Sequence, residues 1–365
     1  MRSKSIDKTL LVSTILLVAA GFFIFSSASM GLLAREGISY SSVAIKQFLI
    51  GFIAGGLVLV VGAKIPYKYW RTYALWLFGI SLLSCILVFV PKIGFAHGGA
   101  KRWLNLGPYT FQPAELLKLG TVIYFAAWIA TAKEKIKTFK YGALPLYIII
   151  AVTGALLMKQ PDTGTFMVLF FALVAMFVAA GGKWRYILLL FGISVLAIIT
   201  LAFVRPYLMA RFLTFLDPSK DSLGSGYQIQ QSLIAIGSGR ITGRGFGQSI
   251  QKFNFLPEPM GDSIFAVASE EFGFIGGASL IFLFLFFAMR GYFVSARIAD
   301  PFGMTLATGI ITLIIAQSFI NIGAMLGVLP LTGIPLIFVS QGGTAMLFGL
   351  AEVGIVLNIS KSRKA

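Results

Sequence analysis

Long apolar stretches, separated by short polar connections, follow one another along almost the whole chain. A helix needs about 20 apolar residues to cross the hydrocarbon core of a bilayer. The pattern therefore predicts an all-α, polytopic integral membrane protein of about ten membrane-spanning helices, forming a single membrane domain over residues 1–365. The predicted spans are 9–34, 45–63, 72–91, 113–132, 141–158, 163–182, 186–204, 263–289, 301–326 and 336–358.

One connection, residues 205–262 between the seventh and eighth predicted spans, is far longer than the others. Loops of this length are usually functional or disordered. Apolar side chains such as Phe212, Tyr227 and Ile234 argue against disorder, and they favour amphipathic helices lying at the membrane surface.

The chain carries a net charge of +17, and its lysines and arginines gather in short loops on one side of the predicted spans. The positive-inside rule places these loops and both termini, with Arg2, Lys4 and Lys364, in the cytoplasm. Residues 205–262 then face outward. A basic chain can bind nucleic acid, but here the charge lies between membrane spans, where lipid head groups are the acidic surface that it meets. With 58% hydrophobic and 12% charged residues, a large soluble core is excluded.

The chain has one histidine, His97, and one cysteine, Cys85. This excludes a zinc site and a catalytic set of the Ser-His-Asp or Cys-His type. Carboxylates, lysines and arginines remain as catalytic groups, and they suit transfer chemistry on a phosphate-linked substrate.

The outward loop 92–113 contains Lys101, Arg102 and Trp103. These side chains can hold a phosphate while the indole lies at head-group level. The alternative is an aromatic belt with cations that reach to the interface.

Gln112 precedes the fourth predicted helix, and Glu115 and Lys118 follow three residues apart within it. The two charges can simply pair on the helix surface. Charges this near the apolar zone are costly and are therefore functional candidates. Asp162, before the sixth helix, can cap that helix or bind a cation or substrate.

The glycine-rich stretch 222–252 includes Arg240, Arg244 and Lys252. No alternation of strands and helices surrounds it, so a nucleotide-binding loop is not expected. Glycine-rich backbone can still form N–H nests for anions, and the basic side chains would add contacts to a diphosphate.

Asp262 stands where the eighth helix begins, shortly after Glu258. It can serve as the helix cap or as a general base, because the helix dipole favours its ionised form. Glu270 and Glu271 follow about 12 Å further along that helix, where a carboxylate requires a basic partner.

Taken together, these segments resemble the SEDS family (shape, elongation, division and sporulation), whose members are ten-span peptidoglycan polymerases. The matching motifs are Gly99-Ala100-Lys101-Arg102-Trp103, Phe111-Gln112-Pro113, Glu115-Leu116, Gln160-Pro161-Asp162-Thr163-Gly164-Thr165, Gly224-Ser225-Gly226-Tyr227-Gln228, Gln231-Ser232, Ala235-Ile236-Gly237-Ser238-Gly239, Leu256-Pro257-Glu258-Pro259, Glu270-Glu271 and Asn321-Ile322-Gly323. Gln251-Lys252, followed by Phe255-Leu256-Pro257-Glu258-Pro259, looks more like the division branch, FtsW, than the elongation branch, RodA.

The resemblance implies lipid II as substrate and transfer of the growing glycan from undecaprenyl diphosphate, with β-1,4 linkages, in the bacterial cytoplasmic (inner) membrane. The family's essential Asp falls on Asp262, and a Lys that pairs with it falls on Lys118. Lys101, Arg102 and Asp162 would approach the same site from other loops. A class B penicillin-binding protein, other division-complex proteins and no nucleic acid are the implied partners. A flippase for lipid II and an elongation-type polymerase are the alternatives.

Neither the motifs nor the resemblance specifies a metal, and no other cofactor is expected. A divalent cation, Mg²⁺ or Mn²⁺, is the candidate for stabilising the leaving diphosphate together with Lys and Arg. The sequence departs from the family pattern beside the catalytic Asp, where Met260-Gly261 stand in place of His-Thr. Ala114 replaces a usual Ser, and Arg240 a usual Gly.

Overall fold

The computed structural model describes residues 5–34, 45, 47–97, 100–107, 109–204, 206–221 and 224–363. Within this part of the chain, eight helical segments are long and apolar enough to cross a membrane. They are Lys8–Leu32, Gln47–Lys64, Pro113–Lys137, Phe139–Lys159, Trp184–Phe203, Ile264–Ala296, Pro301–Met325 and Gly343–Ser360. Two shorter apolar helices, α5 (Ala74–Leu87) and α8 (Thr163–Ala179), lie where the third and sixth spans are predicted. The prediction of an all-α, polytopic membrane protein is confirmed.

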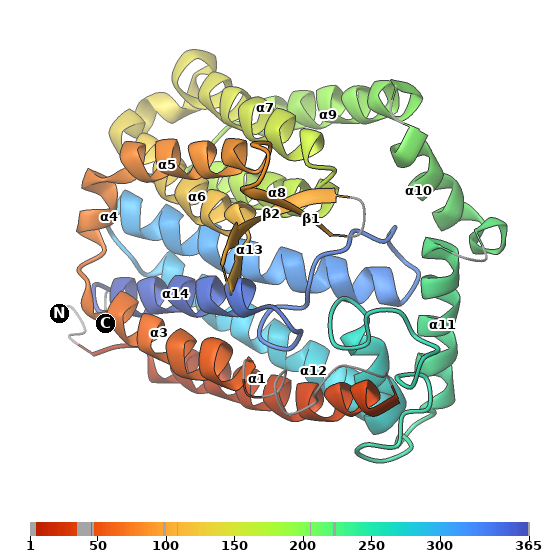
Figure 1. Cartoon of the computed structure of the whole chain (residues 1–365). Helices are drawn as coiled ribbons and strands as arrows, with labels where there is room; N and C mark the ends of the chain where they lie inside the picture. The colour runs from red at the N-terminus through yellow and green to blue at the C-terminus, as the bar shows by residue number, and fades with distance from the viewer. Residues whose placement is uncertain are drawn as a thin grey trace.

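The helices form one bundle, in which α13 (Pro301–Met325) and α6 (Pro113–Ala132) lie in the middle (Figure 1). α13 packs on α6, α8 and α12 (Ile264–Ala296). The remaining helices of the first half are α1 (Lys8–Ala28), η1 (Ser29–Ala34), η2 (Gln47–Ala54), α3 (Gly55–Lys64), α4 (Lys68–Thr72), η3 (Lys133–Lys137), η4 (Phe139–Ala143) and α7 (Leu144–Lys159). Those of the second half are α9 (Trp184–Val204), α10 (Pro206–Leu216), η5 (Pro218–Lys220), α11 (Ser225–Ser238) and α14 (Gly343–Ser360).

Small residues allow α3 and α14 to approach closely. A Cβ added at Gly354 of α14 would lie 2.4 Å from the carbonyl oxygen of Leu59, and one at Gly62 would lie 3.1 Å from that of Ala351. Membrane helices lack a hydrophobic drive to associate, so this kind of close backbone packing holds them together. At the periphery, α9 instead exposes large apolar side chains such as Phe203, which suit contact with lipid.

α12 is broken at Gly273, whose φ of 65° and ψ of −165° are not helical. The break leaves backbone groups of α12 without helical partners, and residues 240–245 satisfy them. The amide of Phe274 donates to the carbonyl of Arg240 (2.8 Å), and the amide of Arg244 donates to the carbonyl of Glu270 (3.0 Å). Such a break is tolerated at membrane depth only where protein supplies the missing hydrogen bonds.

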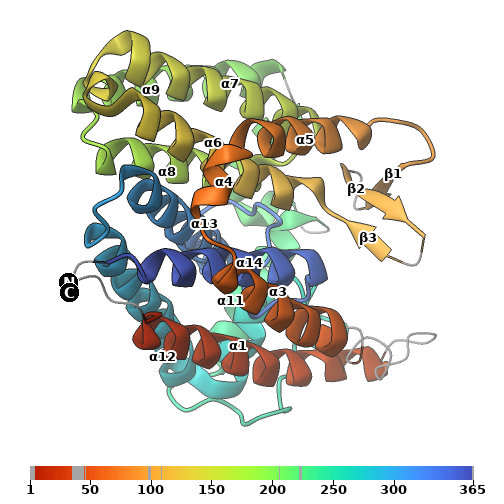
Figure 2. The ribbon, with the colours of Figure 1, turned by 90° about the vertical axis from the view of Figure 1, so that its left-hand side faces the viewer.

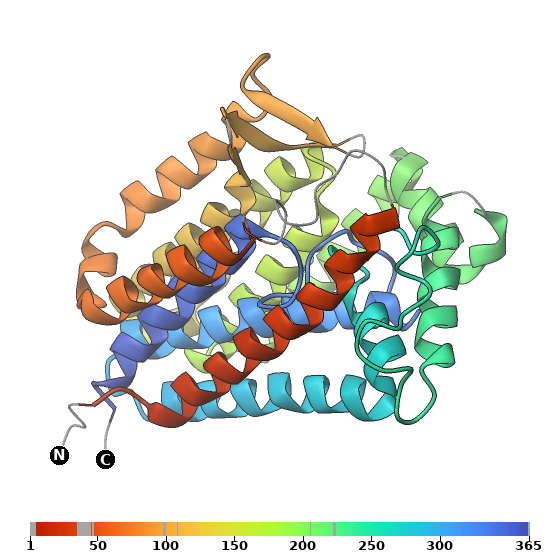
Figure 3. The same ribbon diagram turned by 60° about the horizontal axis from the view of Figure 1, so that its bottom comes forward.

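The start of α1 and the end of α14 lie side by side at one end of the bundle (Figures 1 and 3). Asp7 is fully buried there and accepts two hydrogen bonds from Arg290, at 2.9 and 2.7 Å, and a third from Arg363. Its own amide donates to the Ser360 hydroxyl (2.9 Å). These contacts fasten α1, α12 and the end of α14 to one another.

Three features of the fold differ from the predicted spans or add to them. The tenth helix begins at Gly343 rather than at residue 336, because Pro335 and the hydrogen-bonded turn 336–340 keep the chain non-helical. α12 continues to Ala296, beyond the predicted end at residue 289. The loop 92–113 contains an antiparallel sheet of β1 (Gly94–His97), β2 (Ala100–Leu106) and β3 (Tyr109–Phe111), in that order (Figure 2).

The long connection does contain helices, α10 and α11, as predicted, whereas residues 239–263 are turns and bends. That α10 and α11 lie at a membrane surface stays a prediction. Arg2, Lys4, Gly99 and Lys364, which belong to the predicted orientation and motifs, lie outside the described residues.

Candidate active site

Asp262 lies two residues before α12, which begins at the end of the bundle opposite the termini (Figure 3). Asp262 is half-buried, and its backbone carbonyl accepts a hydrogen bond from the side-chain amide nitrogen of Asn321 (2.8 Å). The same nitrogen donates to the carbonyl of Ile334 (2.9 Å). Asn321, on α13, therefore fixes the backbone of Asp262 against the segment between α13 and α14.

That segment, residues 326–342, also holds the two residues before Asp262. The Ser340 hydroxyl donates to the carbonyl of Gly261, and the Gln341 amide donates to the carbonyl of Met260, both at 2.7 Å. From α11, Gln228 donates to the Ser263 hydroxyl (3.0 Å). Asp262 is thus held by contacts on both sides in the sequence.

Three charged side chains act on the Asp262 carboxylate: Arg102 of β2, Arg211 of α10 and Glu258. Burial raises the pKa of Asp262 to about 6, and the negative charge of Glu258 raises it as well. Arg102 and Arg211 oppose this rise. A carboxyl group with such a pKa is ionised near neutral pH and can still accept a proton, as a general base requires.

Gly333 lies beside both the Asp262 carboxylate and the Arg102 guanidinium. A Cβ at this position would lie 3.6 Å from Oδ2 of Asp262 and 3.8 Å from Nη1 of Arg102, and the φ of Gly333 is +69°. Glycine adopts this φ without strain, and a larger side chain would enter the space between the two charges.

Both arginines are held through the start of α8. Arg102 donates from Nε to the carbonyl of Gln160 (3.3 Å) and from Nη2 to that of Pro161. Arg211 donates from Nη1 to the Thr163 hydroxyl (3.0 Å). Their guanidinium groups are therefore positioned before any ligand binds.

Asp162, between these anchors, is buried and caps α8. It accepts hydrogen bonds from the Thr165 amide (3.2 Å) and the Thr165 hydroxyl (2.9 Å). The sequence left two roles open for Asp162, as a helix cap or as a ligand of a cation or substrate. In the structure its carboxylate caps α8. It supports the site by fixing the turn that binds Arg102.

The resemblance implies that Lys118 pairs with Asp262. In the structure, Lys118 instead pairs with Glu115 of its own helix (2.9 Å). It also donates to Oε1 of Gln317, whose Nε2 donates to the carbonyl of Pro335 (3.1 Å). The Glu115–Lys118 pair is buried rather than on the helix surface, since α13 and α14 cover α6 at this level. Glu352 of α14 lies within electrostatic range of the pair, and its Oε1 has no hydrogen-bond partner among the described residues. Lys118 thus supports the segment beneath the site.

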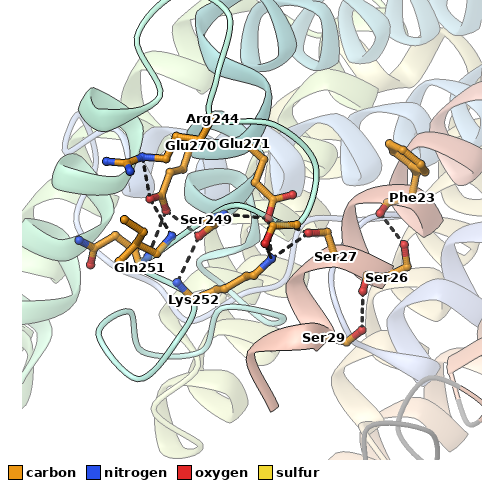
Figure 4. A network of polar contacts seen from close by, with 12 residues as sticks. Phe23, Ser26, Ser27, Ser29, Arg244, Ser249, Gln251, Lys252, Glu270 and Glu271 are labelled. Carbon is orange, nitrogen blue, oxygen red and sulfur yellow. Dashed lines mark hydrogen bonds and ion pairs between the residues drawn. The ribbon is translucent and has the colours of Figure 1, made fainter. Parts of the chain in front are cut away.

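Glu270 and Glu271 form a second polar cluster on α12, away from Asp262, with Arg244 and Lys252 (Figure 4). The prediction that these carboxylates have basic partners is confirmed. Lys252 is fully buried, so it does not present its charge to a ligand as the glycine-rich stretch suggested.

The other predicted site residues have no described contact with Asp262. Lys101 and Arg240 are exposed, and Trp103 is partly exposed. Gln112 is buried at the residue before α6. Their proposed contacts with a substrate stay predictions.

Sequence reasoning missed Arg211 and Gly333. Arg211 is a single cation on the apolar helix α10, which is a detectable signal, but nothing in the sequence points α10 toward Asp262. Gly333 resembles any other turn glycine in the segment between α13 and α14. Asn321 is part of the matching motif Asn321-Ile322-Gly323, but the sequence did not assign it a role in the site.

The chain matches the family model FTSW_RODA_SPOVE, described as "Cell cycle protein", over residues 7–365. It is 37% identical to "Probable peptidoglycan glycosyltransferase FtsW" of Geobacter metallireducens, covering 98% of this chain and 95% of that protein. It is 35% identical to "Stage V sporulation protein E" of Bacillus subtilis, covering 99% and 98%.

Among solved structures, one chain from "Structural coordination of polymerization and crosslinking by a peptidoglycan synthase complex" aligns with a TM-score of 0.79 at 26% identity. The alignment covers 97% of both chains.

Proposed function

The chain belongs to the FtsW, RodA and SpoVE family of cell cycle proteins, and from this premise we propose that it is a peptidoglycan glycosyltransferase. The observation that carries the proposal is the Asp262 carboxylate, with its raised pKa, beside two anchored arginines. The proposed substrate is lipid II and the proposed process is wall synthesis in cell division, because the motifs resemble the FtsW branch and the relatives of that name are peptidoglycan glycosyltransferases.

In the proposed reaction, Asp262 accepts the proton of the acceptor sugar hydroxyl as its oxygen attacks the anomeric carbon of the growing chain. The bond from that carbon to the diphosphate oxygen breaks, and undecaprenyl diphosphate leaves. Attack opposite the leaving group inverts an α-linked donor into a β-1,4 product. Arg102 and Arg211 lie where they can stabilise the negative charge that develops on the diphosphate.

A divalent cation, Mg²⁺ or Mn²⁺, fits the residues present. Among the described residues, however, no three His, Cys, Asp or Glu side chains lie together as a metal-binding group. Mg²⁺ commonly binds one or two carboxylates together with substrate phosphates. Glu258 would supply a carboxylate and the cation would neutralise charge on the diphosphate, while Asp262 would stay free of the metal to accept the proton.

We propose that the chain lies in the bacterial inner membrane, with both termini in the cytoplasm and Asp262 on the opposite face. The basic loops support the cytoplasmic termini, and the distance of the start of α12 from the termini supports the opposite face for Asp262 (Figure 3). A class B penicillin-binding protein is the proposed partner, because the aligned chain comes from a peptidoglycan synthase complex.

The test is to supply the purified full-length chain with lipid II, with and without its transpeptidase, and to resolve the products by length. Glycan polymers longer than the starting disaccharide support the proposal. Parallel reactions with EDTA, then with Mg²⁺ or Mn²⁺ restored, test the cation. Transbilayer movement of labelled lipid II in vesicles without any polymer would instead support the flippase alternative.

The acid limb of the pH–rate profile should follow the pKa of Asp262. The base must be ionised, so kcat/KM should rise with pH through about 6. Glu258→Gln removes a negative charge that raises this pKa, and the limb should move down by about 0.5 pH unit. Glu134→Gln, which changes an exposed carboxylate in η3, is the matched control and should leave the limb in place. If the acid limb of Glu258→Gln lies at the same pH as that of wild type, Glu258 does not influence the pKa of the base.

A further inference from the structure

The break at Gly273 divides α12 into a short part, 264–272, and a long part, 274–296. Asp262 precedes the short part, and Glu270 and Glu271 lie on its last turn. A continuous helix would fix the direction of the short part through its own hydrogen bonds, and the break removes that constraint. Something other than the long part must therefore hold the short part in place.

Residues 240–252 supply part of that support. The Gly245 amide donates to the carbonyl of Glu271 (2.9 Å), which continues the contact that Arg244 makes with Glu270. The carboxylate of Glu270 accepts from the Ser249 hydroxyl (2.6 Å) and from the amides of Ile250 (3.0 Å) and Gln251 (3.3 Å). The short part and this segment therefore form one hydrogen-bonded unit.

Lys252 joins that unit to α1 (Figure 4). Its ammonium lies 2.7 Å from Oε1 of Glu271, 3.0 Å from the Ser27 hydroxyl of α1 and 2.9 Å from the carbonyl of Gly247. Ser27 in turn donates to Oε1 of Glu271 (2.6 Å). Lys252 and Glu271 are both at most 1% exposed, so this pair is shielded from water and from salt.

The segment has two further contacts, one with α1 and one with η1, which directly follows α1. Phe246 stacks on Phe23 with ring centroids 4.5 Å apart. A Cβ at Gly31 would lie 2.5 Å from the carbonyl oxygen of Lys252. The packing is close enough that a change in the Lys252 contacts cannot be absorbed without movement of the segment.

We propose that Lys252 is a positioning residue. Its buried ammonium fixes the short part of α12, which directly follows Asp262 and Ser263, against α1 and so sets the position of the base. This inference rests on the proposed function, because it concerns the geometry of the same reaction. Removing one member of a buried ion pair leaves the other uncompensated, and the unit must shift to solvate or neutralise Glu271. A displacement of about 1 Å at a reacting group can cost about 100-fold in rate.

Lys252→Met keeps an unbranched side chain of nearly the same length and removes its charge. Polymer formation from lipid II should show a kcat about 30- to 100-fold lower, with KM within about threefold of wild type, because Lys252 itself does not contact the site. Lys137→Met removes an exposed ion pair with Glu134 (3.0 Å) and should leave both constants unchanged.

Two further variants separate positioning from simple loss of folding. Glu271→Gln should lower kcat similarly, and the double variant Lys252→Met/Glu271→Gln should be no slower than the slower single variant, because both changes break one interaction. Ser27→Ala removes one hydrogen bond and should lower kcat by about three- to tenfold. Rates are measured per folded molecule, well below the melting temperature of each variant.

A wild-type kcat per folded molecule in Lys252→Met overturns the inference, as does a loss that lies in KM alone or multiplies fully in the double variant. If Lys252→Met does not fold, Ser27→Ala and Glu271→Gln decide in its place, and unchanged kcat in both overturns the inference. Absence of polymer from the wild type in the same assay would instead contradict the proposed function.

Discussion

Asp262→Asn is expected to reduce polymer formation from lipid II by about 10³-fold, since general-base catalysis contributes about 10²- to 10⁴-fold. Asparagine has nearly the shape of aspartate but cannot accept the proton of the attacking hydroxyl. The backbone carbonyl would keep its hydrogen bond from Asn321, so the start of α12 should stay in place. KM should not rise, because loss of the carboxylate leaves Arg102 and Arg211 more positive toward a diphosphate.

The measurement is the initial rate of polymer formation by purified wild-type and variant protein, with binding of lipid II followed separately. Asp300→Asn is the matched control. Asp300 caps α13 through the Gly303 amide (3.1 Å), and asparagine is an equally good cap. Activity of Asp262→Asn within tenfold of wild type would show that Asp262 is not the base.

Gly273→Ala is expected to destabilise the folded protein by about 3 kcal/mol or more. The residue has a φ of 65° and a ψ of −165°, a region open essentially only to glycine. An added Cβ would also lie 2.3 Å from the amide nitrogen of Gly243 and 2.4 Å from the carbonyl oxygen of Ile241. Relief of either clash requires separation of residues 240–245 from α12.

Thermal unfolding in detergent measures this effect, and the buried thiol of Cys85 allows it to be followed with a thiol-reactive dye. The melting temperature should fall by roughly 6 °C or more. Gly237→Ala, in the neighbouring helix α11, adds a Cβ that meets no atom within 4 Å. It should leave the melting temperature unchanged or raise it slightly, because alanine favours a helix. Equal melting temperatures for Gly273→Ala and wild type would mean that the break is not required.

The helices could be predicted because a bilayer imposes a simple rule on the sequence, namely apolar runs of sufficient length between polar ends. The rule fails where protein, rather than lipid, satisfies the backbone. Gly273 lies in an apolar run that looks continuous, and only the folded chain shows residues 240–245 at the break. The sheet 94–111 was missed for a similar reason, since its short strands carry glycine and charged residues and no regular alternation.

The candidate site was predicted in part. Asp262 could be singled out because the resemblance to the SEDS family carries the family's essential Asp onto this position. Its place before a helix would not have sufficed, since Asp162 and Asp300 also precede helices and serve as caps. The partners of that carboxylate depend on tertiary contacts that spacing does not encode. Arg211 reaches the site from a helix within the long connection, while Lys118 turns to Glu115, three residues away on its own helix.

The contacts of Asp7 also bear on how the chain is made. Its partners Ser360 and Arg363 lie 353 and 356 residues later in the sequence, so none of these bonds can form until the ribosome has synthesised the last helix. During all of that time α1 is inserted but not fastened to α14, and the Asp7 carboxylate lacks a partner from the last helix. Closure of this contact therefore follows the synthesis of α14, and until then α1 is held by its packing on α12 and by the bonds from Arg290 to Asp7.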